Sequence, residues 1–204
     1  MGEMNGKIVN LRNTETKINL MRAFAGESQA RNRYTFAANY AREHNLHVVE
    51  AIFTFTANQE LEHAEVFYNF LGNLAGETVD INGSYPINIS DDVLDLLRWA
   101  QHNEYEEYDP VYKEFGDVAK KEGFDSIAAA FYNIAEIEKT HGDRFGKFAD
   151  LIEQKKIFVA DVECKWMCLN CGYIYDGKEV PEVCPVCQHG RGYFIRLEMA
   201  PFSC

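Results

Sequence analysis

Cysteine is absent from most of this 204-residue chain, because all six cysteines lie from Cys164 onward. This distribution argues against a disulfide framework and indicates one local metal-binding module. No apolar run approaches the roughly 20 residues that cross a bilayer, so we expect no membrane association. The start of the chain lacks the basic and apolar regions of a secretory signal, and we therefore expect a cytoplasmic protein.

Basic residues are also scarce, with 20 lysines and arginines against 32 aspartates and glutamates and a formal net charge of -12. Such a surface repels phosphate backbones, so nucleic-acid binding is not expected. The chain lacks the glycine-rich fingerprint of a dinucleotide site, so NADH is not expected to bind it directly. The length of 204 residues allows one good-sized domain and a small one, and hydrophobic residues make up 47% of the chain, so a real core is possible.

Four long helical patterns fill most of the chain before residue 156. The first two cover about 14–43 and 48–71, whereas Ser90 and Asp125 are plausible N-caps for the third and fourth. Pro110 lies inside the third pattern and predicts a kink or bulge there, because proline removes a backbone donor. Residues 72–89 could extend to about 60 Å, which exceeds the roughly 36 Å of a 24-residue helix. A crossover along the whole bundle is therefore possible.

Two Glu-x-x-His motifs, one on the second helix and one on the fourth, are the most informative feature of the chain. Residues three apart lie on the same helical face, and each motif follows a helix that carries a single inward glutamate. The six residues are Glu27, Glu60, His63, Glu104, Glu138 and His141. One glutamate from each of two helices and Glu-x-x-His from each of the other two is the ligand set of ferritin-like di-iron proteins.

The turn positions predict that these residues meet. Glu27 and Glu60 lie at nearly equal distances along the chain from His44, one before it and one after it. In the second half, Glu104 and Glu138 lie at equal distances on either side of Lys121. Helical rise is constant, so each antiparallel hairpin brings its acids to one height. Carboxylates buried together need cations between them, which predicts a two-metal centre. The alternative is that the glutamates lie at the edges of the apolar stripes and reach solvent.

Two Cys-x-x-Cys pairs form a second candidate site. Four thiolates at this spacing make a tetrahedral cage for iron or zinc, and sulfur ligation alone does not select the metal. The four residues are Cys168, Cys171, Cys184 and Cys187. A structural zinc ribbon therefore remains an alternative. Cys164 and Cys204 lie outside this set, and we interpret them as free thiols.

The segment around the first pair resembles a rubredoxin, in which the metal is a single iron that cycles between two oxidation states. Trp166 precedes Cys-x-x-Cys-Gly-Tyr-Ile-Tyr-Asp, which spans Cys168 to Asp176. Apolar and aromatic neighbours would exclude water from the sulfurs and tune the potential. The second pair departs from ordinary rubredoxins, because Gln188 stands where glycine is usual.

Nearly the whole chain resembles the rubrerythrin family. The segments that carry the resemblance are Gly26–Tyr34, Glu60–Ala64, Glu104–Glu107 and Glu138–His141, followed by the rubredoxin-like segment. The resemblance implies a mostly α fold. It consists of a ferritin-like di-iron four-helix bundle with one long crossover at residues 1–156 and a small rubredoxin-like domain, with one iron held by four cysteines, at residues 157–204.

The resemblance also implies roles for single residues. It adds Glu107 as a further carboxylate, and Glu107 and His63 would exchange as ligands when one iron moves on reduction. Glu60 and Glu107 would bridge or shift between the irons with Glu27, Glu104 would hold one iron, and Glu138 with His141 the other. Tyr34 and Tyr112 would lie beside the ligands. From the residues alone, Tyr112 is better interpreted as an ordinary core aromatic.

The activity implied by the resemblance is a peroxidase that reduces hydrogen peroxide to water and protects against oxidative stress. Electrons would come from an NADH-dependent rubredoxin reductase or a rubredoxin and pass through the tail iron. A homodimer or higher homo-oligomer is expected. Two alternatives remain: a ferroxidase or iron-handling ferritin-like protein, and a zinc-bound scaffold whose tail is an interaction module.

Overall fold

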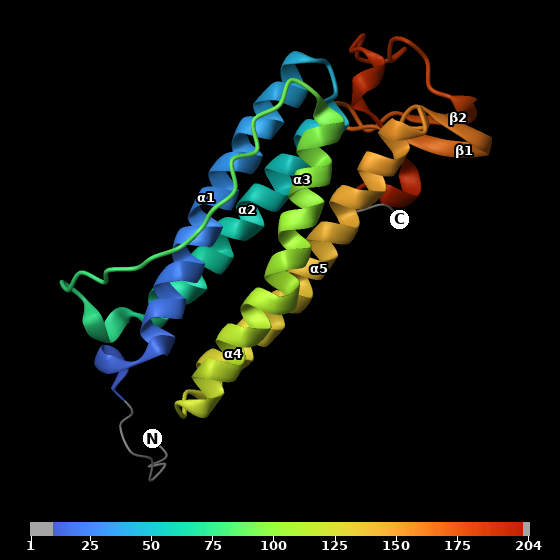
Figure 1. Ribbon diagram of the computed structural model, residues 1–204. Helices are drawn as coiled ribbons and strands as arrows, with labels where there is room; N and C mark the ends of the chain where they lie inside the picture. Colours follow the sequence, from blue (N-terminus) through green and yellow to red (C-terminus); the bar gives the residue numbers. More distant parts are fainter. Residues whose placement is uncertain (1–9, 202–204) are drawn as a thin grey trace.

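The computed structural model describes residues 10–201. Five α-helices precede a small antiparallel sheet (Figure 1). The helices are α1 Glu15–Glu43, α2 His47–Phe70, α3 Val93–Glu106, α4 Tyr112–Lys121 and α5 Asp125–Glu153. A π-helical turn, Glu107–Val111, joins α3 to α4. The strands are β1 Val159–Cys168, β2 Ile174–Glu179 and β3 Phe194–Arg196. Short 3-10 helices lie at Leu11–Asn13, Gly72–Leu74, Arg191–Tyr193 and Leu197–Met199.

The helices form two antiparallel hairpins, which confirms the expected four-helix bundle with α3 and α4 acting as one bent helix. Asn45 and Gly123 adopt positive φ angles at the two hairpin turns, of 57° and 88°. The connection over residues 75–92 runs along α1 from one end of the bundle to the other (Figure 1). Because of this crossover, α2 and α3 run in the same direction. None of the helices within residues 10–201 is long and apolar enough to cross a membrane.

The bend at Pro110 confirms the irregularity predicted from the sequence. The π-helical turn contains Asp109 with φ -153° and ψ 114°, which lies outside the helical region. Pro110 has no N–H to donate, so the regular hydrogen-bond ladder cannot continue through it. The turn begins at Glu107 and ends just before Tyr112, so it sets the directions of both side chains.

Both predicted helix caps are wrong. The N-cap of α3 is Asp92, whose Oδ1 accepts a hydrogen bond from the N–H of Leu94 at 2.8 Å. Ser90 acts just before it, because its Oγ accepts from the N–H of Asp92 at 3.1 Å. Phe124 occupies the N-cap of α5 without a side-chain hydrogen bond, and Asp125 is the first helical residue. The negative charge of an aspartate in the first turn still stabilises the helix, because it interacts favourably with the positive end of the helix dipole.

Two apolar clusters fill the bundle at different heights. The tail-side core includes Tyr34, Phe53, Leu97, Phe145 and Phe148. The far core includes Leu20, Phe67, Tyr112, Phe131 and Ile134. On α1, for example, Ala23 belongs to the far core and Ala30 to the tail-side core, with Glu27 between them. The same alternation holds on the other helices, so the acidic residues form a layer enclosed by hydrocarbon on both sides.

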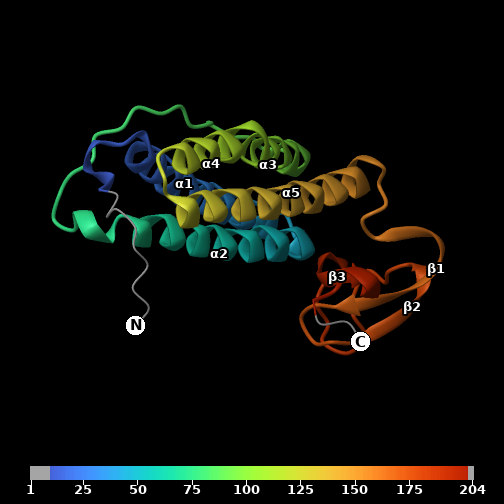
Figure 2. The same cartoon turned by 90° about the horizontal axis from the view of Figure 1, so that it is seen from below.

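The tail forms a three-stranded sheet in the order β2-β1-β3. Trp166 in β1 is opposite Tyr175 in β2 and Arg196 in β3, and it is fully buried. Figure 2 shows the sheet lying beyond one end of the bundle, near the start of α2. There the Tyr193 ring stacks on the His47 ring with centroids 3.9 Å apart. Ile195 belongs to the tail-side core, so the tail packs directly on the bundle.

Candidate metal centres

The four helices bring together all six residues of the two Glu-x-x-His hairpins. All six are buried, and His63 is the most exposed at 7%. Their ligand atoms fall into two groups in which every atom lies within 4.8 Å of the others. One group is Glu27, Glu60, His63 and Glu138; the other is Glu60, Glu104, Glu138 and His141. The convergence predicted from the turn positions is therefore present, and the glutamates do not reach solvent.

Glu60 and Glu138 belong to both groups because each carboxylate directs one oxygen to each histidine. The Nδ1 atom of His63 lies 3.1 Å from Oε2 of Glu60 and 2.9 Å from Oε1 of Glu138. The Nδ1 atom of His141 lies 3.0 Å from Oε1 of Glu60 and 2.9 Å from Oε2 of Glu138. The two imidazoles stack with centroids 5.6 Å apart. This arrangement is that of two carboxylates spanning a pair of cation positions.

Glu27 and Glu104 lie at opposite ends of this arrangement. Oε1 of Glu27 lies 4.0 Å from Nδ1 of His63, and Oε2 of Glu104 lies 3.6 Å from Nδ1 of His141. This grouping differs from the one implied by the resemblance, which put Glu104 and His141 on different irons. Here Glu104 and His141 share one end, and Glu138 directs one oxygen to each end.

The buried polar atoms of this layer show that cations fit it. Seven of them lack a well-oriented hydrogen-bond partner: Oε2 of Glu27, Oε1 of Glu60, Oε2 of Glu104, both carboxylate oxygens of Glu138 and both ring nitrogens of His141. An unpaired buried acceptor costs about 1–3 kcal/mol, and more when it is charged. Carboxylate oxygens and imidazole nitrogens are ligands that suit iron. The layer is therefore a carboxylate-histidine site for an iron pair.

In the absence of metal, the pKa values of the groups in this layer shift in different directions. Burial, followed by repulsion from Glu138 and Glu60, raises the pKa of Glu27 well above its ordinary value. Burial also opposes charge on Glu60, but its contacts with His141 and His63 outweigh this effect and lower the pKa of Glu60 to about 2. Burial opposes charge on His63 too, yet its contacts with Glu138 and Glu60 raise its pKa to about 9. The pKa of Glu27 is thus raised while that of Glu60, in the same layer, is lowered.

Two buried tyrosines donate hydrogen bonds to the terminal carboxylates. The hydroxyl of Tyr112 donates to Oε1 of Glu27 at 2.5 Å, and that of Tyr34 donates to Oε1 of Glu104. Burial and the adjacent carboxylate raise the pKa of each tyrosine well above its ordinary value, so both remain donors. Tyr112 is therefore more than the core aromatic that the residues alone suggested.

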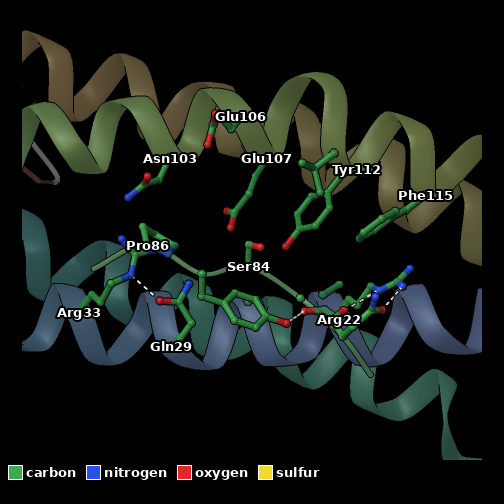
Figure 3. A pocket seen from close by; sticks show the side chains of 16 residues that line it. Arg22, Gln29, Arg33, Ser84, Pro86, Asn103, Glu106, Glu107, Tyr112 and Phe115 are labelled. Carbon is green, nitrogen blue, oxygen red and sulfur yellow. Dashed lines mark hydrogen bonds between the residues drawn. The ribbon is translucent and has the colours of Figure 1, made fainter. Parts of the chain in front are cut away.

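Glu107 lies beside the two ligand groups and belongs to neither. Its half-buried side chain lines a cavity of about 510 Å³ between α1, the crossover and the bend after α3 (Figure 3). Burial, then repulsion from Glu138 and Glu60, raises the pKa of Glu107 to about 8. The step of three residues from Glu104 keeps Glu107 near the acidic layer, and the π-helical turn that begins there leaves it at the cavity wall.

Arg144 is a functional candidate that the sequence reasoning missed. Its guanidinium donates to Oγ1 of Thr56 at 2.8 Å and to Oε1 of Gln59 at 3.0 Å, which ties α5 to α2 beside Glu60. Burial lowers its pKa, and the glutamates of the layer oppose that effect. The available signal was its position three residues after His141, which places it one helical turn along the same face.

The four tail cysteines also converge. Their sulfur atoms lie within 4.8 Å of one another, with 3.8 Å between Cys168 and Cys187 and 3.8 Å between Cys171 and Cys184. Cys168 and Cys184 are buried, whereas Cys171 is exposed. Burial raises the pKa of the Cys168 thiol to about 12, while the N–H of His189 lowers that of Cys187 to about 6. A metal cation would hold all four as thiolates.

The two cysteine turns share one backbone shape. In the first, the carbonyl of Cys168 accepts from the N–H of Gly172, whose φ is 79°. In the second, the carbonyl of Cys184 accepts from the N–H of Gln188, whose φ is 61°. Gln188 thus adopts the left-handed conformation for which glycine is usual. Cys164 is a half-buried free thiol, and Cys204 lies outside the described residues.

Comparisons with known proteins agree with both sites. The family model described as rubrerythrin matches residues 19–149, and the model of the rubrerythrin rubredoxin-like domain matches residues 166–195. The rubrerythrin of Clostridium perfringens is 45% identical over 185 residues, which cover 90% of this chain and 95% of that protein. The rubrerythrin of Porphyromonas gingivalis is 39% identical over 94% of this chain and 93% of its own length.

Solved structures support the same assignment. A mixed-valence nigerythrin aligns with a TM-score of 0.60 and 26% identity over 94% of each chain. A bacterioferritin from Desulfovibrio desulfuricans aligns with a TM-score of 0.61 over 70% of this chain and 82% of its own, at 22% identity, and shows the ferritin-like fold alone. From the two family models and the extent of these matches, we conclude that this chain belongs to the rubrerythrin family of di-iron oxidoreductases with a rubredoxin-like domain.

Proposed function

We propose that this protein is a cytoplasmic peroxidase that reduces hydrogen peroxide to water and thereby protects against oxidative stress. The ligands of its iron pair are Glu27, Glu60, His63, Glu104, Glu107, Glu138 and His141. Those of its single iron are Cys168, Cys171, Cys184 and Cys187. Residues 1–156 form the di-iron domain, and residues 157–204 form the electron-transfer domain.

The observation that carries this proposal is the pairing of two different iron sites in one chain. The bundle holds a buried carboxylate-histidine layer in which seven polar atoms lack a well-oriented hydrogen-bond partner, and the tail holds four converging cysteines. A reduced iron pair supplies two electrons, which is the number that cleaving the O–O bond of a peroxide requires. A ferroxidase or an iron store would not need an attached electron-transfer module.

The residues around the layer hold the ligands in place. Tyr112 and Tyr34 keep their protons and fix one oxygen each of Glu27 and Glu104, which leaves the other oxygen for metal. Such outer hydrogen bonds commonly change metal affinity or activity by about 10–100-fold. The apolar clusters on both sides exclude water and strengthen electrostatic interactions within the layer.

Glu107 and His63 are the residues that we propose to exchange as ligands. His63 already lies among Glu27, Glu60 and Glu138, whereas Glu107 lies at the cavity wall outside both groups. A carboxylate whose pKa is raised to about 8 is also able to hold a proton near neutral pH, beside the cavity through which peroxide would enter.

Electrons would reach the iron pair through the tail, from a rubredoxin or an NADH-dependent rubredoxin reductase. The tail packs at His47, thirteen helical residues from Glu60, which corresponds to roughly 20 Å along α2. Electron transfer weakens steeply with distance, so this separation favours delivery to the iron pair of another subunit in a homodimer or higher oligomer.

Stopped-flow absorption of the anaerobically reduced protein tests the peroxidase. Mixing with hydrogen peroxide is expected to reoxidise the protein rapidly with one peroxide consumed per iron pair, and more slowly with dioxygen. Iron that rises beyond three atoms per chain and forms a mineral would instead favour the ferroxidase alternative. A colourless protein after anaerobic iron loading would favour the zinc-bound scaffold.

The exchange of ligands is tested by His63→Ala. Because Glu107 would hold the oxidised position, the variant is expected to retain iron in the resting state but to turn over peroxide more slowly, by about 10-fold or more. Iron content by metal analysis separates this outcome from a simple loss of metal. Equal peroxide rates for variant and wild type would refute the exchange.

A further inference from the structure

The cavity beside Glu107 is much larger than hydrogen peroxide needs. Its volume is about 510 Å³, whereas one water molecule occupies about 30 Å³ in the liquid and hydrogen peroxide is only slightly larger. Cavities of about 300–1,000 Å³ are typical of sites for drug-sized molecules. The size alone therefore indicates room for a substrate with a carbon body.

The lining has a polar part and an apolar part. Figure 3 shows the side chains of Glu107, Tyr112 and Ser84 directed to one region of the cavity, with Phe115 farther along. Ala23, Val111 and Phe115 supply hydrocarbon. Such a surface suits a molecule with a polar head at Glu107 and an apolar body.

The charges of the lining argue against a charged ligand. Two cations, Arg22 and Arg33, are matched by two carboxylates, Glu106 and Glu107. Both guanidinium groups already have protein partners. Arg22 donates to Glu15, Asn19 and both oxygens of Asn82, and Arg33 donates to Gln29 and Asn88. An anionic substrate would have to displace these partners, so a neutral one fits better.

We infer that this cavity admits neutral organic hydroperoxides, R–OOH, with the peroxide group at Glu107 and the R group against the apolar wall. The inference rests on the proposed peroxidase function and names a further substrate class for it. In the reaction the O–O bond breaks, the reduced iron pair gives up two electrons, and two protons are taken up. The products are one alcohol, R–OH, and one water.

A substitution that fills the cavity should slow the reaction with an organic hydroperoxide more than the reaction with hydrogen peroxide. Ser84 lies on the crossover and is exposed, and its side chain is directed into the cavity. The ring of Ser84→Phe would therefore fill part of the cavity without displacing side chains of the core. Thr78→Phe is the matched control, because Thr78 is exposed on the same crossover and does not line the cavity. We expect Ser84→Phe to lower kcat/KM for cumene hydroperoxide by about 10-fold or more relative to hydrogen peroxide. Thr78→Phe is expected to leave the ratio unchanged.

A binding measurement gives a readout that does not depend on turnover. Titration calorimetry with 2-phenyl-2-propanol, the alcohol left by cumene hydroperoxide, is performed on the anaerobically reduced iron-loaded protein, in which Glu107 is proposed to be free of iron. Saturable binding is expected for wild type and Thr78→Phe and is expected to be lost in Ser84→Phe. Circular dichroism checks that both variants are folded.

The outcomes distinguish this inference from the proposed function. A wild-type protein that turns over hydrogen peroxide but neither binds the alcohol nor reacts with cumene hydroperoxide overturns the inference alone. An equal loss of both activities in Ser84→Phe also overturns it. A protein that binds the alcohol but shows no reoxidation by either peroxide overturns the proposed peroxidase and leaves the cavity as a binding site.

Discussion

The two metal sites of this chain are built in opposite ways. In the bundle, the ligands lie between residues 27 and 141 and meet only because four helices pack in register. In the tail, all four ligands lie between residues 168 and 187 and meet through two local backbone turns. Site geometry therefore depends on tertiary packing in the bundle and on local turns in the tail.

The ligands of the bundle site are also more deeply buried than those of the tail site. Each ligand of the bundle groups is at most 7% exposed, while Cys171 of the tail is open to solvent. The bundle shields its carboxylates between two apolar cores, whereas the tail core consists of a few residues around Trp166 and Phe194. The bundle has enough hydrocarbon to fold around a costly site, and the tail does not. The contrast predicts different dependence on metal.

Removal of metal is the strongest test of this contrast. Chelation is expected to unfold the tail, because scaffolds below about 70–80 residues usually need a metal or disulfides, and a structural metal can contribute about 10 kcal/mol or more to folding. The bundle is expected to stay helical. Amide hydrogen exchange, resolved by segment, would show fast exchange in β1 and β3 and retained protection in α1 and α5. Simultaneous loss of protection in both regions would contradict the contrast.

Loss of one tail ligand is expected to have the next largest effect. Cys171→Ala leaves three thiolates, so turnover supported by an external electron donor should fall by more than about 100-fold. One turnover of chemically pre-reduced protein with hydrogen peroxide should be spared, because the bundle site is intact. Steady-state and single-turnover absorption measure the two quantities. A variant with full donor-driven activity would remove the tail from the electron path.

The same difference decides what the sequence could predict. The tail ligands follow directly from two Cys-x-x-Cys pairs, and even Gln188 adopts the backbone conformation of the glycine it replaces. The bundle ligands were predicted because their distances from the turns match, which is an unusually strong long-range constraint. Nothing local could show that Glu138 spans both histidines, since that depends on how α5 rotates against α2.

The sequence also did not predict the helix caps, the position of Glu107 or the hydrogen bond of Tyr112. The N-cap of α3 is Asp92 and not Ser90, because both side chains accept from nearby backbone N–H groups and the sequence alone does not rank them. The N-cap of α5 is Phe124, which makes no side-chain hydrogen bond and therefore gives no polar signal in the sequence. Pro110 predicted a bend, yet the position of Glu107 at the cavity wall depends on the path of the crossover. The hydrogen bond from the Tyr112 hydroxyl to Glu27 joins residues 85 positions apart, and no local pattern predicts such a contact.

The pH dependence of the metal-free bundle sharpens the comparison further. Glu107 has a folded-state pKa raised by burial to about 8, and His63 one raised to about 9 by Glu138 and Glu60 despite burial. Each raised group holds a proton in the folded state at pH values where the unfolded chain has released it. The free energy of unfolding should therefore fall as pH rises, from about 4.5 to 8 for Glu107 and from about 6.5 to 9 for His63.

The expected slope is about 1.4 kcal/mol per pH unit for each group within its window. Urea unfolding of the metal-free protein near pH 5, 7 and 9, followed by helical circular dichroism, measures it. The iron-loaded protein is the control and should show a much flatter profile, because metal replaces protons in the layer. A metal-free bundle that becomes more stable between pH 5 and 9 would contradict the assigned shifts.

The smallest expected effect concerns the contact between the two regions. A Cβ added at Gly192 would lie 1.8 Å from the carbonyl oxygen of Asn45, and backbone at the α1–α2 turn cannot move aside cheaply. Gly192→Ala should therefore separate the tail from this turn and break the stacking of Tyr193 on His47. Gly190→Ala is the matched control, since its Cβ meets nothing within 4 Å.

We expect the melting temperature of the bundle to change little in either variant. Only Gly192→Ala should speed amide exchange at residues 44–47 and increase the radius of gyration measured by X-ray scattering. Its pre-reduced single turnover with peroxide should match wild type, because no ligand of the iron pair is touched. Identical exchange and scattering in the two glycine variants would mean that the docked tail contributes nothing to how these regions are held together, and the bundle and the tail would then be linked by the chain alone.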